Sequence, residues 1–434
     1  MKILMIGTGY VGLISGLCFA EFGFETVCID KDKNRLQNIK EGKSPFYEPG
    51  LDDLLSKHIN STKLLKLSSN LPKEVKEAKV IFITVGTPSR RLADEADLSS
   101  VYDVIREIAD NIDSYSVIVT KSTVPVGTTN KIKTIISDKI SPDKFDVVAN
   151  PEFLREGSAI NDFMRPDRVI IGTDSKKAEQ IMREIYRPLY LLETPIVSTT
   201  IETAEIIKYA SNSFLATKIS FINEIADLCE VVGADVQDVS KALGLDKRIG
   251  SKFLNSGPGF GGSCFPKDIK AFAVTAKKFN IDLSIINAVN IFNQKRPLRI
   301  VSKISNYYDD NLKNRTLTIL GLSFKPNTDD IRDSSSLIIA KELLNKGAKL
   351  KVNDPKAMKN AKKEIDQLLT YDNVYEACEQ SEGLIIATEW NEYRALDLHR
   401  IKSLLINPVI FDLRNIYNPN EVLIAGIKYF GIGR

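Results

Sequence analysis

The segment MKILMIGTGYVG, residues 1–12, decides the fold of this chain. An apolar run at 3–6 predicts a short strand, and glycines follow it at 7, 9 and 12 in the spacing GxGxxG. A helical pattern comes next, then a second predicted strand at 26–29 that ends on Asp30. A strand, a glycine turn, a helix and a terminal acid in this order are typical of a dinucleotide-binding βαβ unit.

Each part of this segment has a physical role. Gly7 permits a tight turn, Gly9 lets a pyrophosphate approach the backbone, and Gly12 lets the helix pack closely on the strand. The helix N-terminus then faces the pyrophosphate. Asp30 would hydrogen-bond the ribose hydroxyls of adenosine and repel a 2′-phosphate, which favours NAD over NADP. Basic residues at 31, 33 and 35 leave some use of NADP open.

The alternation of short apolar runs with amphipathic stretches continues through the first half of the chain. It predicts further strands at residues 80–85, 117–120, 147–149, 169–172 and 196–198. Strands that alternate with helices form a parallel sheet with helices on both faces. We therefore expect an α/β fold that begins with an NAD-binding Rossmann domain over residues 1–198.

The pattern changes after residue 200. Residues 200–232 contain neither proline nor glycine and carry apolar residues at helical spacing. This predicts one helix roughly 50 Å long at about 1.5 Å per residue. More helix is predicted at 236–243 and from 269 to about 308, so we expect a central helical dimerisation domain over 199–308. The apolar surface of the long helix exceeds what one subunit would cover, which favours a homodimer.

Strand and helix alternate again in the last part of the chain. Strands are predicted at 316–320, 350–353, 384–387 and 409–413, with a helix at 337–345. These elements predict a C-terminal Rossmann-like α/β domain over residues 309–434, and the family resemblance described below implies that it binds the sugar nucleotide.

The composition is that of a globular chain with several cores. Of the 434 residues 43% are hydrophobic and 26% charged, and the net charge of +3 argues against a nucleic-acid partner. Five scattered cysteines without a CxxC pair and only two histidines argue against a disulfide framework and a metal site. No apolar run approaches the ~20 residues of a membrane helix, and the start lacks a signal-peptide pattern. We expect a cytoplasmic protein without a membrane partner.

A glycine-rich loop precedes a predicted helix at residues 257–268, which read GPGFGGSCFPKD. The glycines allow the backbone to wrap closely around a ligand, and Pro266 suits the first turn of the helix. Cys264 would lie just before the helix N-terminus with Lys267 close by, and both features favour the thiolate. The alternative for a cysteine is a small buried hydrophobe. That is what we expect of the other four, Cys18, Cys28, Cys229 and Cys378.

A dinucleotide site combined with an activated cysteine predicts a particular chemistry. Hydride transfer to the cofactor converts an alcohol to an aldehyde, to which a thiolate can add. The thiohemiacetal can lose a second hydride to give a thioester, which water hydrolyses. The sequence therefore predicts a four-electron oxidation of an alcohol to a carboxylate.

Over nearly its whole length the chain resembles the UDP-glucose/GDP-mannose dehydrogenase family. Besides GTGYVG, the motifs that carry the resemblance are GTP (86–88), STVPVG (122–127), NPEFLREG (150–157), GFGGSCFPKD (259–268) and GLSFKPNTDDIRDS (321–334), with Lys208 and Asn212 between them. The resemblance implies oxidation of UDP-glucose to UDP-glucuronate, because residues 150–159 and 259–268 look most like the glucose branch. GDP-mannose or another nucleotide sugar remains open as the substrate.

The resemblance also implies catalytic roles for seven residues: Thr123, Glu152, Glu156, Lys208, Asn212, Cys264 and Asp268. Cys264 would be the nucleophile, and Thr123 and Asp268 would hold a water near the reacting carbon. Lys208 and Asn212 stand four apart on one helix face, where they would stabilise an oxyanion and orient the sugar or water. Glu152 would be the acid–base residue of thioester hydrolysis, and Glu156 would contact the cofactor or the catalytic water. Which of Asp268, Lys208 and Glu152 takes each proton stays open.

Binding residues are implied in the same way. Those for NAD are Gly7, Gly9, Val11, Gly12, Asp30, Arg35, Thr87, Thr123, Glu156, Lys267 and Arg332. Those for the sugar nucleotide are Phe153, Leu154, Lys208, Phe253, Leu254, Asn255, Ser256, Gly257, Gly261 and Lys325, with Arg248 reaching in from a neighbouring subunit. Arg414 fits a substrate contact and a structural ion pair equally well. Residues 89–95 replace the family's usual Ser- and Gly-rich stretch, so no contact is transferred to them.

Two other classes of protein share part of this pattern. A two-electron 3-hydroxy-acid dehydrogenase also pairs a Rossmann domain with a long helix, but it has no use for Cys264 or for a third α/β domain. A non-catalytic NAD-binding scaffold should have lost catalytic residues, and none of the implied positions is replaced. The four-electron dehydrogenase is therefore the favoured interpretation.

Overall fold

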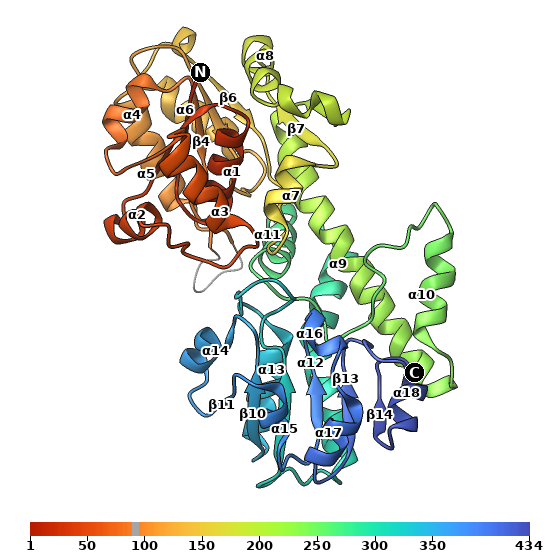
Figure 1. Ribbon diagram of the computed structural model, residues 1–434. Helices are drawn as coiled ribbons and strands as arrows, with labels where there is room; N and C mark the ends of the chain where they lie inside the picture. The colour runs from red at the N-terminus through yellow and green to blue at the C-terminus, as the bar shows by residue number, and fades with distance from the viewer. Residues whose placement is uncertain (89–94) are drawn as a thin grey trace. The chain divides into compact units, whose positions relative to one another are not determined.

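The computed structural model describes residues 1–88 and 95–434, which form two compact units (Figure 1). The first unit comprises Met1–Ser211 with Ala271–Ile281, and the second comprises Asn212–Lys270 with Asp282–Arg434. The division falls within the long helix α9, Ile201–Val232. The three-domain division at 198 and 308 stays a prediction.

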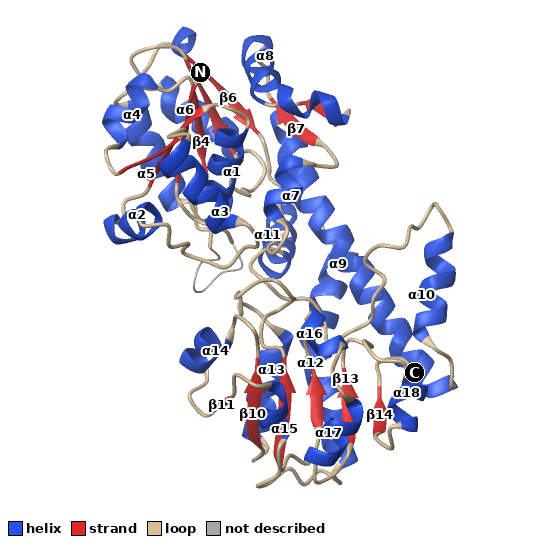
Figure 2. Ribbon diagram, in the orientation of Figure 1, coloured by secondary structure: helices blue, strands red, loops and turns tan. Residues whose placement is uncertain are grey.

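An eight-stranded sheet forms the centre of the first unit, in the order β3-β2-β1-β4-β5-β6-β7-β8 (Figure 2). Its strands are β1 (Lys2–Ile6), β2 (Glu25–Ile29), β3 (Leu65–Ser68), β4 (Val80–Ile83), β5 (Ser116–Thr120), β6 (Phe145–Ala149), β7 (Val169–Gly172) and β8 (Ile196–Thr199). The order reverses between β1 and β4, which is the point where doubly wound sheets bind their ligands.

The expectation of a wholly parallel sheet is wrong at one place, because β6 pairs antiparallel with β7. The link between them contains the NPEFLREG turn and only one short helix, α7 (Ala159–Met164). A link of this kind returns the chain in the opposite direction, whereas a parallel pair needs a crossover. The other neighbouring strands of this sheet are parallel.

Helices cover both faces of this sheet. They are α1 (Tyr10–Glu21), α2 (Lys33–Lys40), α3 (Leu51–Ser56), α4 (Leu71–Glu77), α5 (Ser99–Ala109), α6 (Thr128–Ser137), α7 and α8 (Lys176–Ile185). Side chains of β1 alternate between two cores: Ile3 and Met5 pack in one, and Leu4 and Ile6 in the other. Because successive side chains of a strand point to opposite faces, a strand that is buried on both faces needs apolar residues at every position.

The helical region begins with α9, one helix with nearly the predicted bounds. It continues with α10 (Val236–Leu245), α11 (Phe265–Lys278) and α12 (Ser284–Tyr307). The helix predicted from 269 to about 308 is present as two helices, because the chain turns at 279–283. Asn280 has a φ of +59° there, the left-handed conformation that commonly ends a helix and that asparagine tolerates.

The second unit contains a parallel six-stranded sheet in the order β11-β10-β9-β12-β13-β14. Its strands are β9 (Thr316–Leu320), β10 (Lys349–Asn353), β11 (Leu369–Thr370), β12 (Leu384–Ile386), β13 (Val409–Asp412) and β14 (Lys428–Phe430). Its helices after α12 are α13 (Ser335–Asn345), α14 (Met358–Glu364), α15 (Val374–Cys378), α16 (Asn391–Arg394), α17 (Leu398–Leu404) and α18 (Pro419–Ile424). Together the elements confirm the predicted fold class. No helix within the described residues is long and apolar enough to cross a membrane.

Candidate functional site

The glycine turn at residues 7–12 joins β1 to α1. Gly7 has a φ of +107°, and a Cβ there would lie 3.0 Å from the Thr84 carbonyl oxygen. A Cβ on Gly12 would overlap the Gly7 carbonyl, whereas a Cβ on Gly9 would meet no atom within 4 Å. Gly9 also begins α1 without a side-chain cap. The turn therefore leaves open space beside a helix N-terminus, which fits a pyrophosphate.

Asp30 follows β2 and lies next to this turn. Its carboxylate accepts hydrogen bonds from the Thr8 backbone N–H at 3.0 Å and the Thr8 hydroxyl at 2.6 Å. The Asp32 N–H at 3.0 Å and the Arg35 guanidinium at 3.3 Å are further donors. Burial would raise the pKa of Asp30, but these donors outweigh it and hold the pKa below its usual value. The residue is a fixed anion beside the glycine turn.

Replacing Asp30 with alanine should therefore narrow the preference for NAD over NADP, because the charge that repels a 2′-phosphate is lost. We expect the ratio of the two kcat/KM values to fall roughly tenfold, which is about 1.4 kcal/mol. Asp32→Asn is the matched control, since it removes a nearby charge and keeps an acceptor that can cap α2. Equal kcat/KM with both cofactors in the unmodified protein would contradict the assignment of Asp30.

A buried ion pair marks the first of two clusters of residues for which the family resemblance implies catalytic roles. Lys208 on α9 lies 3.0 Å from the Glu152 carboxylate, and their side chains are 4% and 5% exposed. The Leu154 N–H donates to Glu152 at 2.6 Å, and the Lys208 ammonium lies 5.2 Å from the centre of the Phe153 ring. The NPEFLREG turn thus carries a carboxylate whose orientation is fixed from both sides.

Glu205 was not predicted, yet it connects two of the predicted elements. It lies on α9 three residues before Lys208, and its buried carboxylate accepts from the N–H groups of Gly127 at 2.7 Å and Thr129 at 2.9 Å. Burial raises the pKa of Glu205, although both N–H groups act against this. The turn that holds Thr123 is thereby attached to the helix that holds Lys208. The sequence signal that could have revealed Glu205 is an acidic residue three positions before Lys208 on an otherwise apolar helix.

Thr123 and Glu156 lie in the STVPVG and NPEFLREG segments. The Thr87 hydroxyl donates to the Thr123 carbonyl at 2.9 Å, so two of the implied cofactor residues are in direct contact. Glu156 is partly buried on the turn that follows Glu152.

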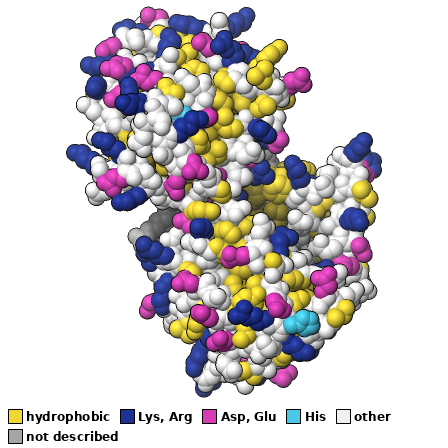
Figure 3. Space-filling view, in the orientation of Figure 1, with side chains coloured by type: hydrophobic (Ala, Val, Ile, Leu, Met, Phe, Trp, Pro, Cys, Tyr) yellow, Lys and Arg dark blue, Asp and Glu magenta, His cyan; other side chains and the backbone are white. Residues whose placement is uncertain are grey.

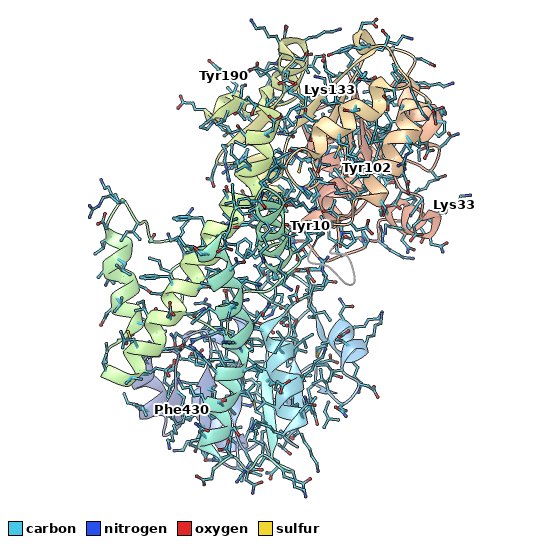
Figure 4. The ribbon with its side chains drawn as sticks, turned by 180° about the vertical axis from the view of Figure 1, so that it is seen from behind. Tyr10, Lys33, Tyr102, Lys133, Tyr190 and Phe430 are labelled. Carbon is cyan, nitrogen blue, oxygen red and sulfur yellow. The ribbon has the colours of Figure 1, made fainter. Side chains whose placement is uncertain are left out.

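Glu48 is a second residue that the motifs did not reveal. Its buried carboxylate accepts from the N–H groups of Gly157 at 2.6 Å and Ala159 at 2.7 Å, and from the hydroxyl of Tyr10. Tyr10 is the first residue of α1 and is labelled in Figure 4. Glu48 therefore joins the Glu156 turn to the helix that starts at the glycine turn.

The second cluster surrounds the start of α11. Cys264 immediately precedes this helix, and its carbonyl accepts the Asp268 N–H at 2.8 Å. The buried Asp268 carboxylate accepts from Asn212 Nδ2 at 2.7 Å and from the Lys267 ammonium at 2.8 Å. Cys264 Sγ lies 3.6 Å from the Ser263 hydroxyl. The three residues Cys264, Lys267 and Asp268, which lie close together in sequence, therefore form one group with Asn212 of α9.

The environment of Cys264 differs from that of the other cysteines. Cys264 is partly exposed at a helix N-terminus, whereas the remaining four are buried. Burial raises the pKa of Cys28 to about 12 and that of Cys378 to about 12, and it raises the pKa of Cys18 further. Burial thus disfavours the thiolate at these three residues, whereas a partly exposed position at a helix N-terminus makes Cys264 suited to nucleophilic chemistry.

The glycine-rich loop packs against the GLSFKPNTDDIRDS segment. Gly262 N–H donates to the Arg332 carbonyl at 2.8 Å. A Cβ on Gly261 would overlap the Asp333 carbonyl, and one on Gly262 would overlap the Phe324 ring. These two glycines allow close packing within the protein, in addition to any contact with a ligand. The two motifs therefore form a single structural unit.

Arg296, from the middle of α12, supports the same loop and was also not predicted. Its buried guanidinium donates to the Gly257 carbonyl at 3.0 Å and pairs with Asp227. The Asn223 side chain accepts the Gly257 N–H at 2.7 Å. Both polar groups of this glycine are thus fixed by buried side chains.

The remaining implied binding residues have varied surroundings. Leu254 and Ser256 are buried, and Asn255 between them is exposed. Phe253 has a φ of +66°, a conformation rare for a bulky residue and worth attention at a binding loop. Lys325 is partly buried, with its ammonium 5.3 Å from the Phe324 ring.

Three implied or considered arginines form ion pairs within the chain. Arg248 is 88% exposed and pairs with Asp246 at 2.6 Å, and Arg332 pairs with Asp330 at 2.6 Å. Arg414 pairs with Glu389 at 3.1 Å and donates to the carbonyls of Ala387 and Phe324. Arg414 thus forms the structural ion pair that was weighed against a substrate contact. Its hydrogen bonds to the two carbonyls also support the segment before Lys325.

The glycine turn with its fixed anion has the form of a dinucleotide-binding site. The chain matches the three domain models of the UDP-glucose/GDP-mannose dehydrogenase family: the NAD binding domain over residues 1–190, the central domain over 202–295 and the UDP binding domain over 318–419. The chain belongs to this family, which confirms the resemblance and the NAD cofactor.

Similar proteins cover the chain from end to end. A UDP-glucose 6-dehydrogenase of Rhizobium meliloti (strain 1021) is 49% identical, with 100% of both chains covered. The UDP-glucose 6-dehydrogenase TuaD of Bacillus subtilis (strain 168) is 45% identical, covering 100% of this chain and 93% of that protein. The structure of a UDP-glucose dehydrogenase from the archaeon Pyrobaculum islandicum superposes with a TM-score of 0.92 at 35% identity, covering 100% of this chain and 97% of the other.

Proposed function

We propose that this chain oxidises UDP-glucose to UDP-glucuronate and reduces two NAD for each sugar. The observation that carries the proposal is the Cys264 group at the start of α11, in a chain that also has an NAD-binding turn. The names of full-length relatives and the match to a UDP binding domain support UDP-glucose as the substrate. GDP-mannose or another nucleotide sugar is the alternative, because these sugars would require the same group of residues.

Bound NAD would supply the hydride acceptor for both oxidations. The open space at Gly9 would receive its pyrophosphate, and Asp30 would bind its adenosine ribose. Arg35 is already paired with Asp30 at 3.3 Å, so it borders the same ribose. These residues fit the cofactor without rearrangement of the turn.

The covalent steps belong to Cys264. Its thiolate would add to the aldehyde carbon, forming a C–S bond and an alkoxide that the Lys208 ammonium stabilises. Loss of a hydride converts this thiohemiacetal to a thioester. Glu152 would then take one proton from a water that attacks the thioester, and the C–S bond breaks to release the thiolate and a carboxylic acid, which loses the second proton to solvent and becomes the carboxylate. Asn212 and Asp268 would orient the water and the sugar.

A panel of nucleotide sugars tests the proposal. NADH formation is measured with UDP-glucose, GDP-mannose and an N-acetylated UDP-sugar, and the number of NADH per sugar is counted. We expect the highest kcat/KM and two NADH per sugar with UDP-glucose. A higher kcat/KM with GDP-mannose would support the alternative substrate. One NADH per sugar would exclude the four-electron route, and no reduction with any sugar would indicate a scaffold.

A cytoplasmic location is part of the proposal. All five cysteines are free thiols, and chains with unpaired cysteines are typical of reducing compartments. A reactive thiolate such as that proposed for Cys264 also needs such a compartment to stay reduced.

We further propose a homodimer through α9. Phe214, Phe221 and Leu228 recur every seven residues and are 65%, 48% and 57% exposed, so they lie along one face of the helix. Figure 3 shows hydrophobic side chains gathered over α9 on the visible face. Exposed apolar surface of this extent is typical of an interface. Arg248, being 88% exposed, is available to a neighbouring subunit.

Replacing Phe221 with glutamate should convert the dimer to a monomer, because a dimer would bury two charges on this apolar face. Analytical ultracentrifugation at micromolar concentration measures the change, and activity should fall with the loss of the dimer. Ile424→Glu is the matched control, since Ile424 is 82% exposed on α18 and outside the proposed interface. A fully active monomer of the unmodified protein would contradict the proposal.

A further inference from the structure

A buried lysine lies near the turn that carries Glu152. Lys121 is the first residue after β5 and is 4% exposed. Its ammonium donates to Asn150 Oδ1 at 3.1 Å and to the Tyr186 hydroxyl at 3.3 Å. Both hydrogen-bond partners are neutral groups. A buried ammonium without a carboxylate among its hydrogen-bond partners is unusual, because burial disfavours the charged form.

Aromatic rings surround this ammonium. The rings of Phe163 at 5.7 Å, Phe82 at 5.8 Å and Tyr186 at 6.0 Å offer it their electron-rich faces. Burial nevertheless lowers the pKa of Lys121 to about 8. The charge of Glu152 acts in the opposite direction to burial, and the charge of Lys208 acts in the same direction. Lys121 therefore interacts electrostatically with both members of the proposed catalytic pair.

The contacts of Lys121 lead to Glu152 through the side chain of Asn150. Besides the bond from Lys121, Asn150 Oδ1 accepts the Tyr186 hydroxyl at 2.7 Å, and its Nδ2 donates to the Ile170 carbonyl at 2.7 Å. Every polar atom of this amide is occupied. Since Asn150 begins the turn that carries Glu152 two residues later, Lys121 helps to fix the turn at its first residue.

A small cavity adjoins the same groups. Its volume is about 40 Å³, and Lys121, Asn150, Glu152, Arg168 and Tyr186 are among the residues that line it. An ordered water needs roughly 10–15 Å³ of such volume and polar partners, so this cavity can hold water between the ammonium and the carboxylate.

We propose that Lys121 is a positioning residue for Glu152: its ammonium fixes Asn150 and provides, together with Lys208, a second positive charge for the Glu152 carboxylate. The inference rests on the proposed role of Glu152 as the base of thioester hydrolysis. A base must lie within hydrogen-bond reach of the water that it deprotonates, so the position of the turn that carries Glu152 matters for this role. Other charged or titratable groups that face Lys121 or line its cavity are Cys18, Asp162, Arg168 and Tyr186.

Lys121→Met tests the charge. Methionine matches the length of the lysine stem and removes an ion that burial disfavours, so the variant is expected to fold. We expect thioester hydrolysis in a single turnover to slow at least tenfold at neutral pH. The acid limb of its pH–rate profile should move upward by about one unit, the size of effect that one nearby opposite charge exerts. The first hydride transfer and the KM for UDP-glucose should change less than twofold.

Tyr186→Phe separates the hydrogen bonds of this group from the charge, because it removes the hydroxyl that contacts both Asn150 Oδ1 and the Lys121 ammonium but keeps the lysine and its own bond to Asn150. We expect little change in its pH–rate profile, and Lys121→Arg, if it folds, should restore the profile that Lys121→Met shifts. Thermal unfolding checks that each variant is folded, and Lys121→Gln replaces Lys121→Met if the latter is not.

Two results would overturn the inference. One is an unchanged hydrolysis rate and pH profile in the folded neutral variant, and the other is an equal shift in Tyr186→Phe. Glu152→Gln separates this inference from the proposed function. If Glu152→Gln hydrolyses the thioester normally, the proposed base itself is wrong. If it accumulates thioester while Lys121→Met does not, only the role of Lys121 is wrong.

Discussion

Replacing Cys264 with alanine is expected to abolish the two-NADH stoichiometry and to lower the overall rate on the order of a thousandfold or more, as loss of a covalent nucleophile does elsewhere. Without the thiol no thiohemiacetal forms, so the second hydride has no bound donor. Binding of NAD should persist, because the glycine turn and Asp30 make no use of the thiol. NADH per sugar and the rate of NADH formation are the measurements.

The control for this variant is Cys229→Ala, which alters a buried cysteine on α9. Activity of that control should stay close to that of the unmodified protein, apart from a modest loss of stability from the smaller side chain. If Cys264→Ala still produced two NADH per sugar at the normal rate, the covalent route would be wrong, and Cys264 would be a packing residue in a glycine loop.

Replacing Glu152 with glutamine should trap the thioester on Cys264. Glutamine keeps the shape of the side chain but cannot accept a proton from water, so hydrolysis should slow by about 10²–10⁴-fold, the usual contribution of a general base. Intact-protein mass spectrometry after mixing with UDP-glucose and NAD should show the covalent sugar nucleotide.

This variant also removes the partner of a buried ammonium, since Lys208 and Glu152 are 3.0 Å apart. Loss of one member of a buried pair typically costs about 3–5 kcal/mol, so its thermal unfolding must be measured alongside. The double variant Glu152→Gln/Cys264→Ala should show no adduct at all. A single variant that turns over at the normal rate without an adduct would remove Glu152 from the hydrolytic step.

Most of the fold could be predicted because its signals are local. Buried strands such as β1 and β4 are continuous apolar runs, and the glycine turn between β1 and α1 occupies consecutive residues. The missed strands β3, β11 and β14 are short elements at or near sheet edges. Their sequences, LKLS, LT and KYF, contain polar residues at exposed or partly exposed positions, so no continuous apolar run marks them. The turn at Asn280 was missed because the surrounding apolar spacing continues through it.

The candidate site divides in the same way. Cys264, Asp268 and Lys267 lie within five consecutive residues, so a motif reveals them together. Glu205 and Glu48 act on backbone groups far away in sequence, at Gly127 and Gly157, and no local pattern records such pairings. Lys121 could not be found from the sequence for the same reason, because its proposed role depends on its burial near Glu152 in the folded chain. Sequence thus located the side chains proposed for the chemistry but not those that hold them.

The close packing of the glycine-rich loop on the GLSFKPNTDDIRDS segment has a consequence for recombination. The Gly261–Asp333 and Gly262–Phe324 fits leave no room for a Cβ, so the two segments must suit each other in backbone path as well as in side chains. A chimera of this chain with a distant relative should survive when both segments come from one parent. Crossovers between residues 264 and 323 should be depleted in a library selected for folding. Exchange of C-terminal segments between relatives would therefore have to include the glycine-rich loop.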